Sequence, residues 1–212
     1  MELQERYGVR LLIATMNRGK VREFREILGQ EGVEWDDLTA HEGVAVAEET
    51  GPTFVANACQ KAAHYARLLK TYAVADDSGL EVDALDGGPG VHSARWAEMH
   101  DAGQGDGDNN ALLLGQIEKV ADERRTARFV CVLAVADAEG RIIVTSRDSV
   151  EGRVIREARG SNGFGYDPLF FVEEYGRTMA ELSGDEKHRI SHRGKALRRL
   201  RGVMGRVWGS GE

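Results

Sequence analysis

Residues 71–80 read TYAVADDSGL, in which a short apolar run meets two adjacent aspartates. An apolar run of this length between polar residues predicts a buried strand. Residues 9–15 (VRLLIAT) predict another buried strand, and a further short strand is predicted at 43–46. Residues 21–28 and 54–70 carry apolar side chains at helical spacing. Strands that alternate with helices in this way predict an α/β fold.

The second half of the chain predicts mainly strands. Residues 127–137 and 141–155 are strand-like, and the turn AEG between them is a strong hairpin signal. The other predicted elements are a helix around 111–120 capped by Asp108, a strand at 169–172 and a basic helix from about Ser191. We therefore expect a central mixed β-sheet, with parallel and antiparallel parts, flanked by helices in a single domain over residues 1–212.

The composition is typical of a soluble globular protein, with 42% hydrophobic and 30% charged residues. No segment approaches the roughly 18 apolar residues that a membrane span needs, and the first residues lack the pattern of a secretory signal. Cys59 and Cys131 lie in regular segments and are interpreted as reduced core residues of a cytoplasmic protein. The net charge of −7 argues against nucleic acid as a partner.

The stretch TMNRGK, residues 15–20, lies between a predicted strand and a predicted helix. The free backbone N–H groups of a helix N-terminus attract anions, and Thr15, Asn17 and Lys20 add hydroxyl, amide and ammonium donors. The spacing of a Walker P-loop is missing. This pattern favours either a phosphate-binding site or a plain polar cap of the helix.

Carboxylates form the next candidate group. An acidic pair ends at Glu49, before the helix that carries Lys61, and Asp76 and Asp77 follow the apolar run. Strand ends carry ligand-facing residues in α/β folds, and carboxylates there hold Mg²⁺ or orient water. Neighbouring strand residues face opposite sides, so one aspartate is expected to face the ligand. Each group has a structural alternative. The glutamates could be surface charge, Lys61 could be a solvated helix lysine, and the aspartates could begin an ordinary turn through Ser78.

The loop SNGFGYDPLFF, residues 161–171, combines glycines with aromatic residues. Glycine lets a backbone approach a flat ligand closely, and Phe164 and Tyr166 offer a ring for stacking. Asp167 adds a hydrogen-bond acceptor beside that ring. The alternative interpretation is a buried aromatic corner without a ligand.

Three basic residues, Lys187, His192 and Arg193, precede or open the last predicted helix. They offer donors to a phosphate or a carbonyl group, although a solvated basic helix would show the same pattern. Phosphate donors, metal-binding carboxylates, a stacking ring and edge-reading donors together predict a nucleoside triphosphate site.

Several stretches between Thr15 and Leu197, in the same order, resemble motifs of the inosine triphosphate pyrophosphatase (Ham1-type) family. They are TMNRGK, AEETGPTFVANACQKA, ADDSGLEVDALDGGPGVHSARWA, TARFVCVL, GFGYDPLF and AELSGDEKHRISHRGKAL. Matched order over nearly the whole chain makes the resemblance specific. The chain departs from the family pattern at His92, Glu98 and His188, and residues 97–110 (AEMHDAGQGDGDNN) are unusual in composition.

The resemblance implies an elongated α/β structure with a central mixed sheet, a substrate cleft between two lobes, and a homodimer. It also implies Mg²⁺-dependent hydrolysis of deaminated purine nucleoside triphosphates (ITP, dITP and XTP) to the monophosphate and pyrophosphate, which cleanses the nucleotide pool. Two alternatives are a Maf-type pyrophosphatase acting on other nucleoside triphosphates and a non-catalytic nucleotide-binding regulatory module.

The resemblance further implies roles for single residues. Asp77 is expected to accept the proton of the attacking water and, with Glu49, to bind the metal, with Asp76 in support. Phe164 is expected to stack on the purine. The residues expected to bind substrate are Thr15, Asn17, Lys20, Lys61, Ser78, Phe164, Gly165, Tyr166, Asp167, Lys187, His192 and Arg193.

Overall fold

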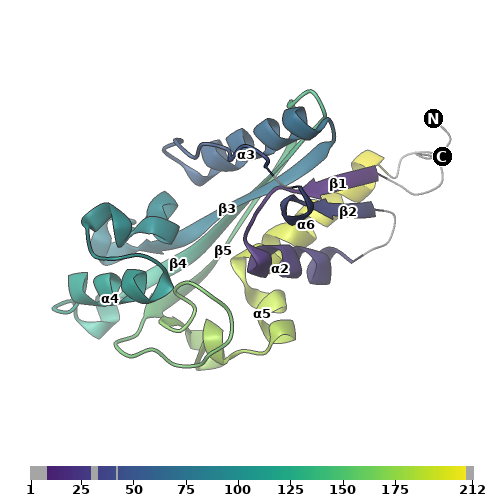
Figure 1. Ribbon diagram of the computed structural model, residues 1–212. Helices are drawn as coiled ribbons and strands as arrows, with labels where there is room; N and C mark the ends of the chain where they lie inside the picture. The colour runs from purple at the N-terminus through teal and green to yellow at the C-terminus, as the bar shows by residue number, and fades with distance from the viewer. Residues whose placement is uncertain (1–8, 30–32, 42, 209–212) are drawn as a thin grey trace. The chain divides into compact units, whose positions relative to one another are not determined.

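The structure is a computed structural model that describes residues 9–29, 33–41 and 43–208. Strands and helices alternate in the first part of the chain, whereas four strands and then two helices follow one another in the second part, with short 3₁₀ turns in several places (Figure 1). The elements are β1 (Val9–Ile13), α2 (Arg18–Leu28), β2 (Val33–Asp37), α3 (Phe54–Leu69), β3 (Tyr72–Val82), α4 (Asp106–Gln116), β4 (Thr126–Ala136), β5 (Ile142–Val154), β6 (Phe170–Val172), β7 (Arg177–Thr178), α5 (Gly184–Ile190) and α6 (His192–Trp208).

Within the described residues, seven strands form one mixed sheet in the order β2-β1-β3-β4-β5-β6-β7. The strand β1 pairs in parallel with β2 and β3, whereas β6 pairs antiparallel with β5 and β7. Residues 137–141 join the neighbouring strands β4 and β5 at the predicted turn. The predicted α/β class with a mixed sheet is confirmed.

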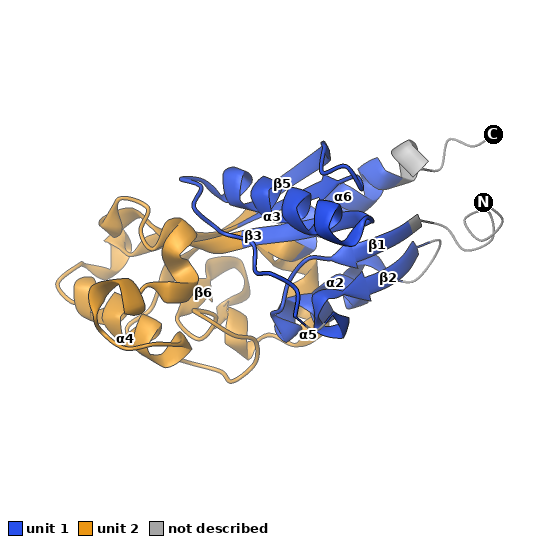
Figure 2. Ribbon diagram, turned by 45° about the horizontal axis from the view of Figure 1, so that its top comes forward, with its two compact units in different colours: residues 1–77, 131–148, 194–212 blue, residues 78–130, 149–193 orange. Residues whose placement is uncertain are grey.

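The chain divides into two compact units (Figure 2). Unit 1 contains residues 1–77, 131–148 and 194–212, and unit 2 contains residues 78–130 and 149–193. The strand β3 therefore contributes Asp77 to unit 1 and the next residue, Ser78, to unit 2. The single domain over the whole chain and the cleft between two lobes stay predictions.

The core of unit 1 forms where α2 and α6 bury their apolar stripes. Val21, Phe24 and Leu28 recur at helical spacing on α2 and are buried together with Leu11 of β1 and Leu200 of α6. Leu11, Leu12 and Ile13 of β1 are all fully buried, as expected for a parallel strand covered on both faces. Burial of each large apolar side chain contributes about 1.5–3 kcal/mol.

Unit 2 has its own apolar core. Leu113 and Ile117 at the end of α4 are buried with Phe129 of β4 and Phe170 of β6. The rings of Phe129 and Phe170 lie 4.5 Å apart between centroids. This core supports the segments that carry the predicted loop and the three basic residues.

Several predicted elements need correction. The strand predicted at 43–46 is wrong, and β2 lies at Val33–Asp37 instead. The strand predicted to end at Asp76 and Asp77 is longer than expected, because β3 continues to Val82 and carries both aspartates in its interior. The helix predicted around 111–120 begins at Asp106, and its N-cap is Gly105 rather than Asp108.

Neither cysteine forms a disulfide bond in the described structure. Cys131 is buried, which confirms its assignment to the core, whereas Cys59 is only half-buried, so the same assignment is wrong for Cys59. In the part of the chain that the structure describes, no helix combines the length and apolar character that a bilayer crossing demands.

Candidate functional site

The predicted site residues form two groups, one inside each unit. The group in unit 1 begins at the N-terminus of α2. Asn17 is the N-cap, and its Oδ1 accepts a hydrogen bond from the backbone N–H of Lys20 at 3.1 Å. Thr15 Oγ1 accepts a hydrogen bond from the backbone N–H of Asn17 at 3.2 Å. The interpretation as a helix cap is confirmed, and phosphate binding by these residues stays a prediction.

The side chain of Asp76 is fully buried and lies on the α2 side of β3. It forms an ion pair with Lys20 Nζ, and the thiol of Cys131 donates a hydrogen bond to its other oxygen at 3.0 Å. A buried carboxylate is stable only when it is paired and hydrogen-bonded. Asp76 therefore holds the ammonium group of Lys20 beside the N-terminus of α2.

Asp77 follows directly and turns its side chain the opposite way, towards α3. Lys61 Nζ lies 3.9 Å from Asp77 Oδ1 and 3.0 Å from Glu49 Oε1, and it donates a hydrogen bond to the backbone oxygen of Asp76 at 2.9 Å. Only 9% of Lys61 is exposed, so the interpretation as a solvated helix lysine is wrong. One buried ammonium group thus joins both predicted metal ligands.

The carboxyl group of Asp77 is held in an unusual state. Burial raises its pKa to about 6, although Lys61, Lys20 and a hydrogen bond from Asn57 act to lower it. Its Oδ2 atom is buried and has no hydrogen-bond partner among the described residues. A buried oxygen without a partner is rare in folded proteins, and it marks a position that a cation or a water can satisfy.

The residues around Asp77 fit a magnesium ion that is completed by substrate. Among residues 9–29, 33–41 and 43–208, no three His, Cys, Asp or Glu side chains are grouped so that they alone could hold a metal. Mg²⁺, however, usually uses one or two carboxylates and fills its other positions with waters and substrate phosphates. Glu49 and Asp77, which both contact Lys61, are the two carboxylates that could fill this role.

The group in unit 2 contains the glycine-aromatic loop. At Gly163 a Cβ atom would overlap the carboxylate of Asp167, and Gly165 has a φ of +63°, which other residues rarely adopt. Asp167 Oδ2 accepts hydrogen bonds from the backbone N–H of Phe164 at 2.9 Å and from Lys187 Nζ at 2.7 Å. The glycines therefore let a buried carboxylate tie the loop to α5.

The ring of Phe164 lies close to two of the three predicted basic residues. Lys187 Nζ is 4.8 Å and Arg193 Cζ is 5.6 Å from its centroid, both within the range of a cation–π interaction. Arg193 also donates a hydrogen bond to Ser78 Oγ at 2.8 Å. The ring of His192 stacks on Phe129 at 4.9 Å.

The basic residues of this group are buried rather than solvated. Lys187 and His192 are each 6% exposed and Arg193 is 1% exposed, so the alternative of a solvated basic face is wrong for all three. Tyr166 is buried as well, and its hydroxyl donates a hydrogen bond to the backbone oxygen of Ser93 at 2.9 Å. Tyr166 and Asp167 thus shape the loop from inside unit 2.

Two contributing residues were missed at the level of sequence. Cys131 was interpreted only as a core residue, yet its thiol contacts Asp76, and Asn57 hydrogen-bonds Asp77. Asn57 Oδ1 also accepts a hydrogen bond from the backbone N–H of Gly51 at 2.7 Å. The available signal for Asn57 was its place in the sequence. It is an asparagine among alanines on the same predicted helix as Lys61.

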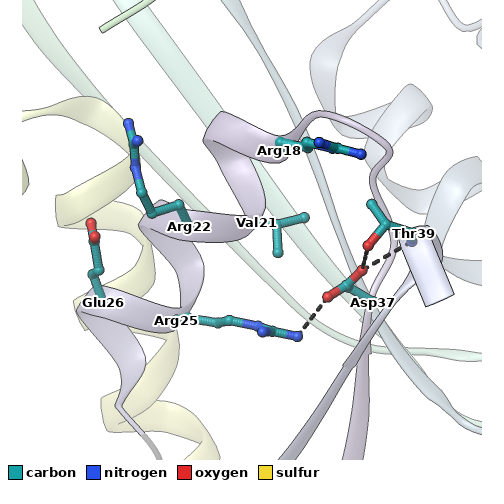
Figure 3. Close-up of a pocket in the computed structure, with 7 residues that line it drawn as sticks. All are labelled: Arg18, Val21, Arg22, Arg25, Glu26, Asp37 and Thr39. Carbon is teal, nitrogen blue, oxygen red and sulfur yellow. Dashed lines mark hydrogen bonds and ion pairs between the residues drawn. The ribbon is translucent and has the colours of Figure 1, made fainter. Parts of the chain in front are cut away.

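A hollow of about 420 Å³ in unit 1 has none of the predicted site residues in its lining (Figure 3). It is lined by Arg18, Val21, Arg22, Arg25, Glu26, Asp37 and Thr39. The guanidinium of Arg25 lies 2.5 Å from Asp37 Oδ2, and the Thr39 hydroxyl donates a hydrogen bond to Asp37 Oδ1. These contacts satisfy the buried Asp37 and join α2 to the end of β2, which is a structural role.

Comparisons with known proteins agree along nearly the whole chain. A model of the Ham1 family matches residues 11–203. The chain is 48% identical over 201 residues to a dITP/XTP pyrophosphatase of Desulforamulus reducens, covering 94% of the chain and 98% of the relative. It is 50% identical over 192 residues to a dITP/XTP pyrophosphatase of Bacillus anthracis, covering 90% of the chain and 93% of that relative.

Solved structures agree as well. A HAM1 protein from Coxiella burnetii matches with a TM-score of 0.83 and 39% identity, covering 93% of this chain and 99% of that one. A nucleoside-triphosphatase / dITP/XTP pyrophosphatase from Mycobacterium abscessus matches with a TM-score of 0.71 and 42% identity, covering 90% and 98%. The observed sheet and helices are therefore those of known folded relatives.

The raised pKa of Asp77 predicts a pH-dependent stability in metal-free protein. Because the folded state binds the proton more tightly, wild-type protein should lose stability relative to Asp77→Asn as pH rises from 3.8 to about 6. The loss should reach at most about 3 kcal/mol. Urea unfolding in chelator from pH 3.5 to 7.5 measures it.

Asp83→Asn is the control for this experiment, because hydrogen bonds from Thr126 and Arg128 lower the pKa of Asp83. Wild-type protein should gain stability relative to that variant as pH rises, which is the opposite sign. A difference between wild type and Asp77→Asn that does not change with pH would contradict the assignment.

The buried pair in unit 2 predicts a large loss of stability when one partner is removed. Asp167→Asn leaves the Lys187 ammonium buried without its counter-charge, which should cost about 3–5 kcal/mol of unfolding free energy. The double variant Asp167→Asn with Lys187→Met should recover part of this loss in urea unfolding. Glu139→Gln breaks an exposed ion pair with Arg141 and should change little. Equal losses for Asp167→Asn and Glu139→Gln would refute the prediction.

Proposed function

The chain belongs to the Ham1 family, and from that membership we propose that it hydrolyses deaminated purine nucleoside triphosphates, namely ITP, dITP and XTP, to the monophosphate and pyrophosphate. The observation that carries the proposal is the arrangement around Asp77. A buried carboxylate with a raised pKa and an unpartnered oxygen lies beside two lysines that can bind phosphate. Strongly perturbed carboxyl groups of this kind are typical of catalytic sites.

Phosphate binding falls to the residues of unit 1. A nucleoside triphosphate carries three to four negative charges, and phosphoryl transfer asks a protein mainly for positioning and charge neutralisation. Lys20 and Lys61 are held by the buried carboxylates of Asp76 and Asp77 and supply two positive charges. Thr15 and Asn17 add polar groups at the N-terminus of α2, where the helix dipole also favours an anion.

We propose Mg²⁺ as the cofactor, with Glu49 and Asp77 as its protein ligands. The donor set is two carboxylates, and Mg²⁺ prefers such oxygen ligands together with waters and substrate phosphates. When bound, the ion neutralises phosphate charge and lowers the pKa of a coordinated water.

Asp77 performs the proton transfer in this proposal. Water attacks the α-phosphorus in line with the bond to the β-phosphate, that bond breaks, and pyrophosphate leaves. The Asp77 carboxylate orients the water and accepts its proton. In the metal-free protein, burial raises the pKa of this carboxyl group to about 6, so its surroundings favour proton uptake at this position. Lys61, whose ammonium group donates a hydrogen bond to the Asp76 backbone oxygen, binds the phosphate in this proposal.

Recognition of the base falls to the residues of unit 2. We propose that the purine stacks on Phe164, with the backbone of Gly165 beside it and Tyr166 and Asp167 supporting the loop. Lys187, His192 and Arg193 donate to the carbonyl at position six of hypoxanthine or xanthine. Adenine carries an amino group there, which cannot accept the hydrogen bonds that the carbonyl accepts, and such mismatches give strong discrimination.

We also propose that the protein is a cytoplasmic homodimer that acts on free nucleotides rather than on nucleic acid or a membrane. The net charge of −7 supports a small-molecule substrate over a polyanionic partner. Sedimentation of the purified chain tests the dimer directly.

An assay of a substrate panel tests the function. Purified protein should release pyrophosphate from ITP, dITP and XTP in the presence of Mg²⁺, with ATP a poor substrate and little turnover in chelator. Release of orthophosphate would contradict the assigned bond. A preference for other nucleoside triphosphates would favour a Maf-type activity, and binding without turnover would favour a regulatory module.

The catalytic role of Asp77 predicts the kinetics of one variant. Asp77→Asn should fold normally by circular dichroism and lose about 10²–10⁴ in kcat for ITP, the usual size of general acid–base assistance. The loss can be larger because the same carboxylate also binds the metal. Asp83→Asn, a change at an exposed ion pair, serves as the control and should retain activity. Unchanged turnover in Asp77→Asn would remove this residue from catalysis.

A further inference from the structure

The segment 97–110, unusual in its composition, ends in the first turns of α4 and contacts the glycine-aromatic loop of unit 2. Asp106 Oδ2 accepts a hydrogen bond from the backbone N–H of Gly165 at 2.7 Å. Asn110 Nδ2 donates a hydrogen bond to the backbone oxygen of Gly165 at 3.1 Å. Asp106 and Asn110, one helical turn apart, therefore bind the backbone N–H and C=O of Gly165.

These contacts matter because Gly165 is a point in the loop where the backbone has more conformational freedom than at other residue types. It has a φ of +63°, and no side chain of its own restricts it. The preceding residue is Phe164, whose own N–H is already fixed by Asp167. A rotation at Gly165 would turn the peptide group next to Phe164. The two hydrogen bonds from α4 restrict this rotation.

We propose that Asp106 and Asn110 are positioning residues that set the orientation of the Phe164 ring for the purine. The proposal rests on the proposed function, in which that ring stacks on the base. Neither residue touches the substrate; both act through the backbone of Gly165. Asp106 makes a hydrogen bond with an ionised acceptor, which is stronger than one between neutral groups.

A simpler explanation for Asp106 is that an acidic residue in the first turn of a helix compensates the dipole. The chain contains a matched control for this alternative. Asp108 lies in the same turn of α4, and its Oδ2 accepts a hydrogen bond from the backbone N–H of Gln104 at 2.7 Å. Asp108 shares the charge and the place in the helix with Asp106 but is bonded to a different segment.

The loop has another anchor, which makes the experiment practicable. The Tyr166 hydroxyl is bonded to the backbone of Ser93, and the ring is buried in the core of unit 2. Loss of the α4 contacts should therefore loosen Gly165 without unfolding the loop. An effect on nucleotide binding would then reflect a changed orientation of the Phe164 ring rather than unfolding of the loop.

The test compares Asp106→Ala, Asp106→Asn and Asn110→Ala with Asp108→Ala. Glycine-selective ¹⁵N labelling gives the shift and exchange rate of the Gly165 amide, a readout that does not depend on activity. Kinetics with ITP give KM and kcat, and calorimetry gives the affinity for pyrophosphate. Asp106→Asn is the conservative variant, because its amide oxygen can still accept the hydrogen bond.

Asp106→Ala should speed exchange of the Gly165 amide and raise KM for ITP roughly fivefold to tenfold, because the carboxylate is solvent-exposed and contributes at the lower end for a charged hydrogen bond. Its kcat should stay within about twofold of wild type, and its affinity for pyrophosphate should not change. Asn110→Ala should change amide exchange and KM in the same direction. Asp106→Asn should show smaller changes than Asp106→Ala, and Asp108→Ala should have the wild-type exchange rate and KM.

The proposal is overturned if Asp106→Ala and Asp108→Ala have the same KM for ITP, or if the Gly165 amide does not respond to Asp106→Ala. A wild-type chain that releases no pyrophosphate from any purine nucleoside triphosphate is a different result. It would reject the proposed function itself, and the positioning role for the base would fall with it.

Discussion

Two adjacent carboxylates in the interior of β3 are the constraint on which unit 1 depends. A strand turns neighbouring side chains to opposite sides, so Asp76 and Asp77 need separate partners. An isolated buried charge would cost several kcal/mol. The chain meets this need with Lys20 at the start of α2 and Lys61 in the middle of α3. Both helices are thereby fixed to the strand by the groups that are proposed to bind phosphate.

Unit 2 solves a similar problem with a loop instead of a strand. Asp167 is buried and is paired with Lys187, and it also accepts the backbone N–H of Phe164. The same carboxylate therefore compensates a buried cation and shapes the segment that carries the aromatic ring. In both units, a polar network positions the predicted ligand-binding groups through buried partners, so little reorganisation is needed when a nucleotide binds.

The sequence predicted the α/β class and the hairpin because each has a local signal, and the candidate site residues were singled out by local motifs as well. It failed where tertiary structure decides. In β2, Val33 and Trp35 alternate with acidic residues, which hides a parallel strand. Asp76 and Asp77 were interpreted as the end of a strand. They lie inside β3 instead, because lysines from two helices compensate their buried charges. The thiol contact of Cys131 with Asp76 joins residues 55 positions apart, and no local pattern encodes it.

Asp77 shows why stability alone does not explain this arrangement. Its burial raises its pKa to about 6, so at neutral pH the ionised group opposes folding, and one oxygen has no partner in the described residues. An amide side chain of similar size would remove the cost of ionising this carboxyl group, while Lys61 would keep Glu49 as a counter-charge. The flanking residues Val74, Leu80 and Val82 are almost fully buried and offset the penalty within β3. A group that weakens the fold while facing Lys61 and Glu49 is best explained by chemistry at that position.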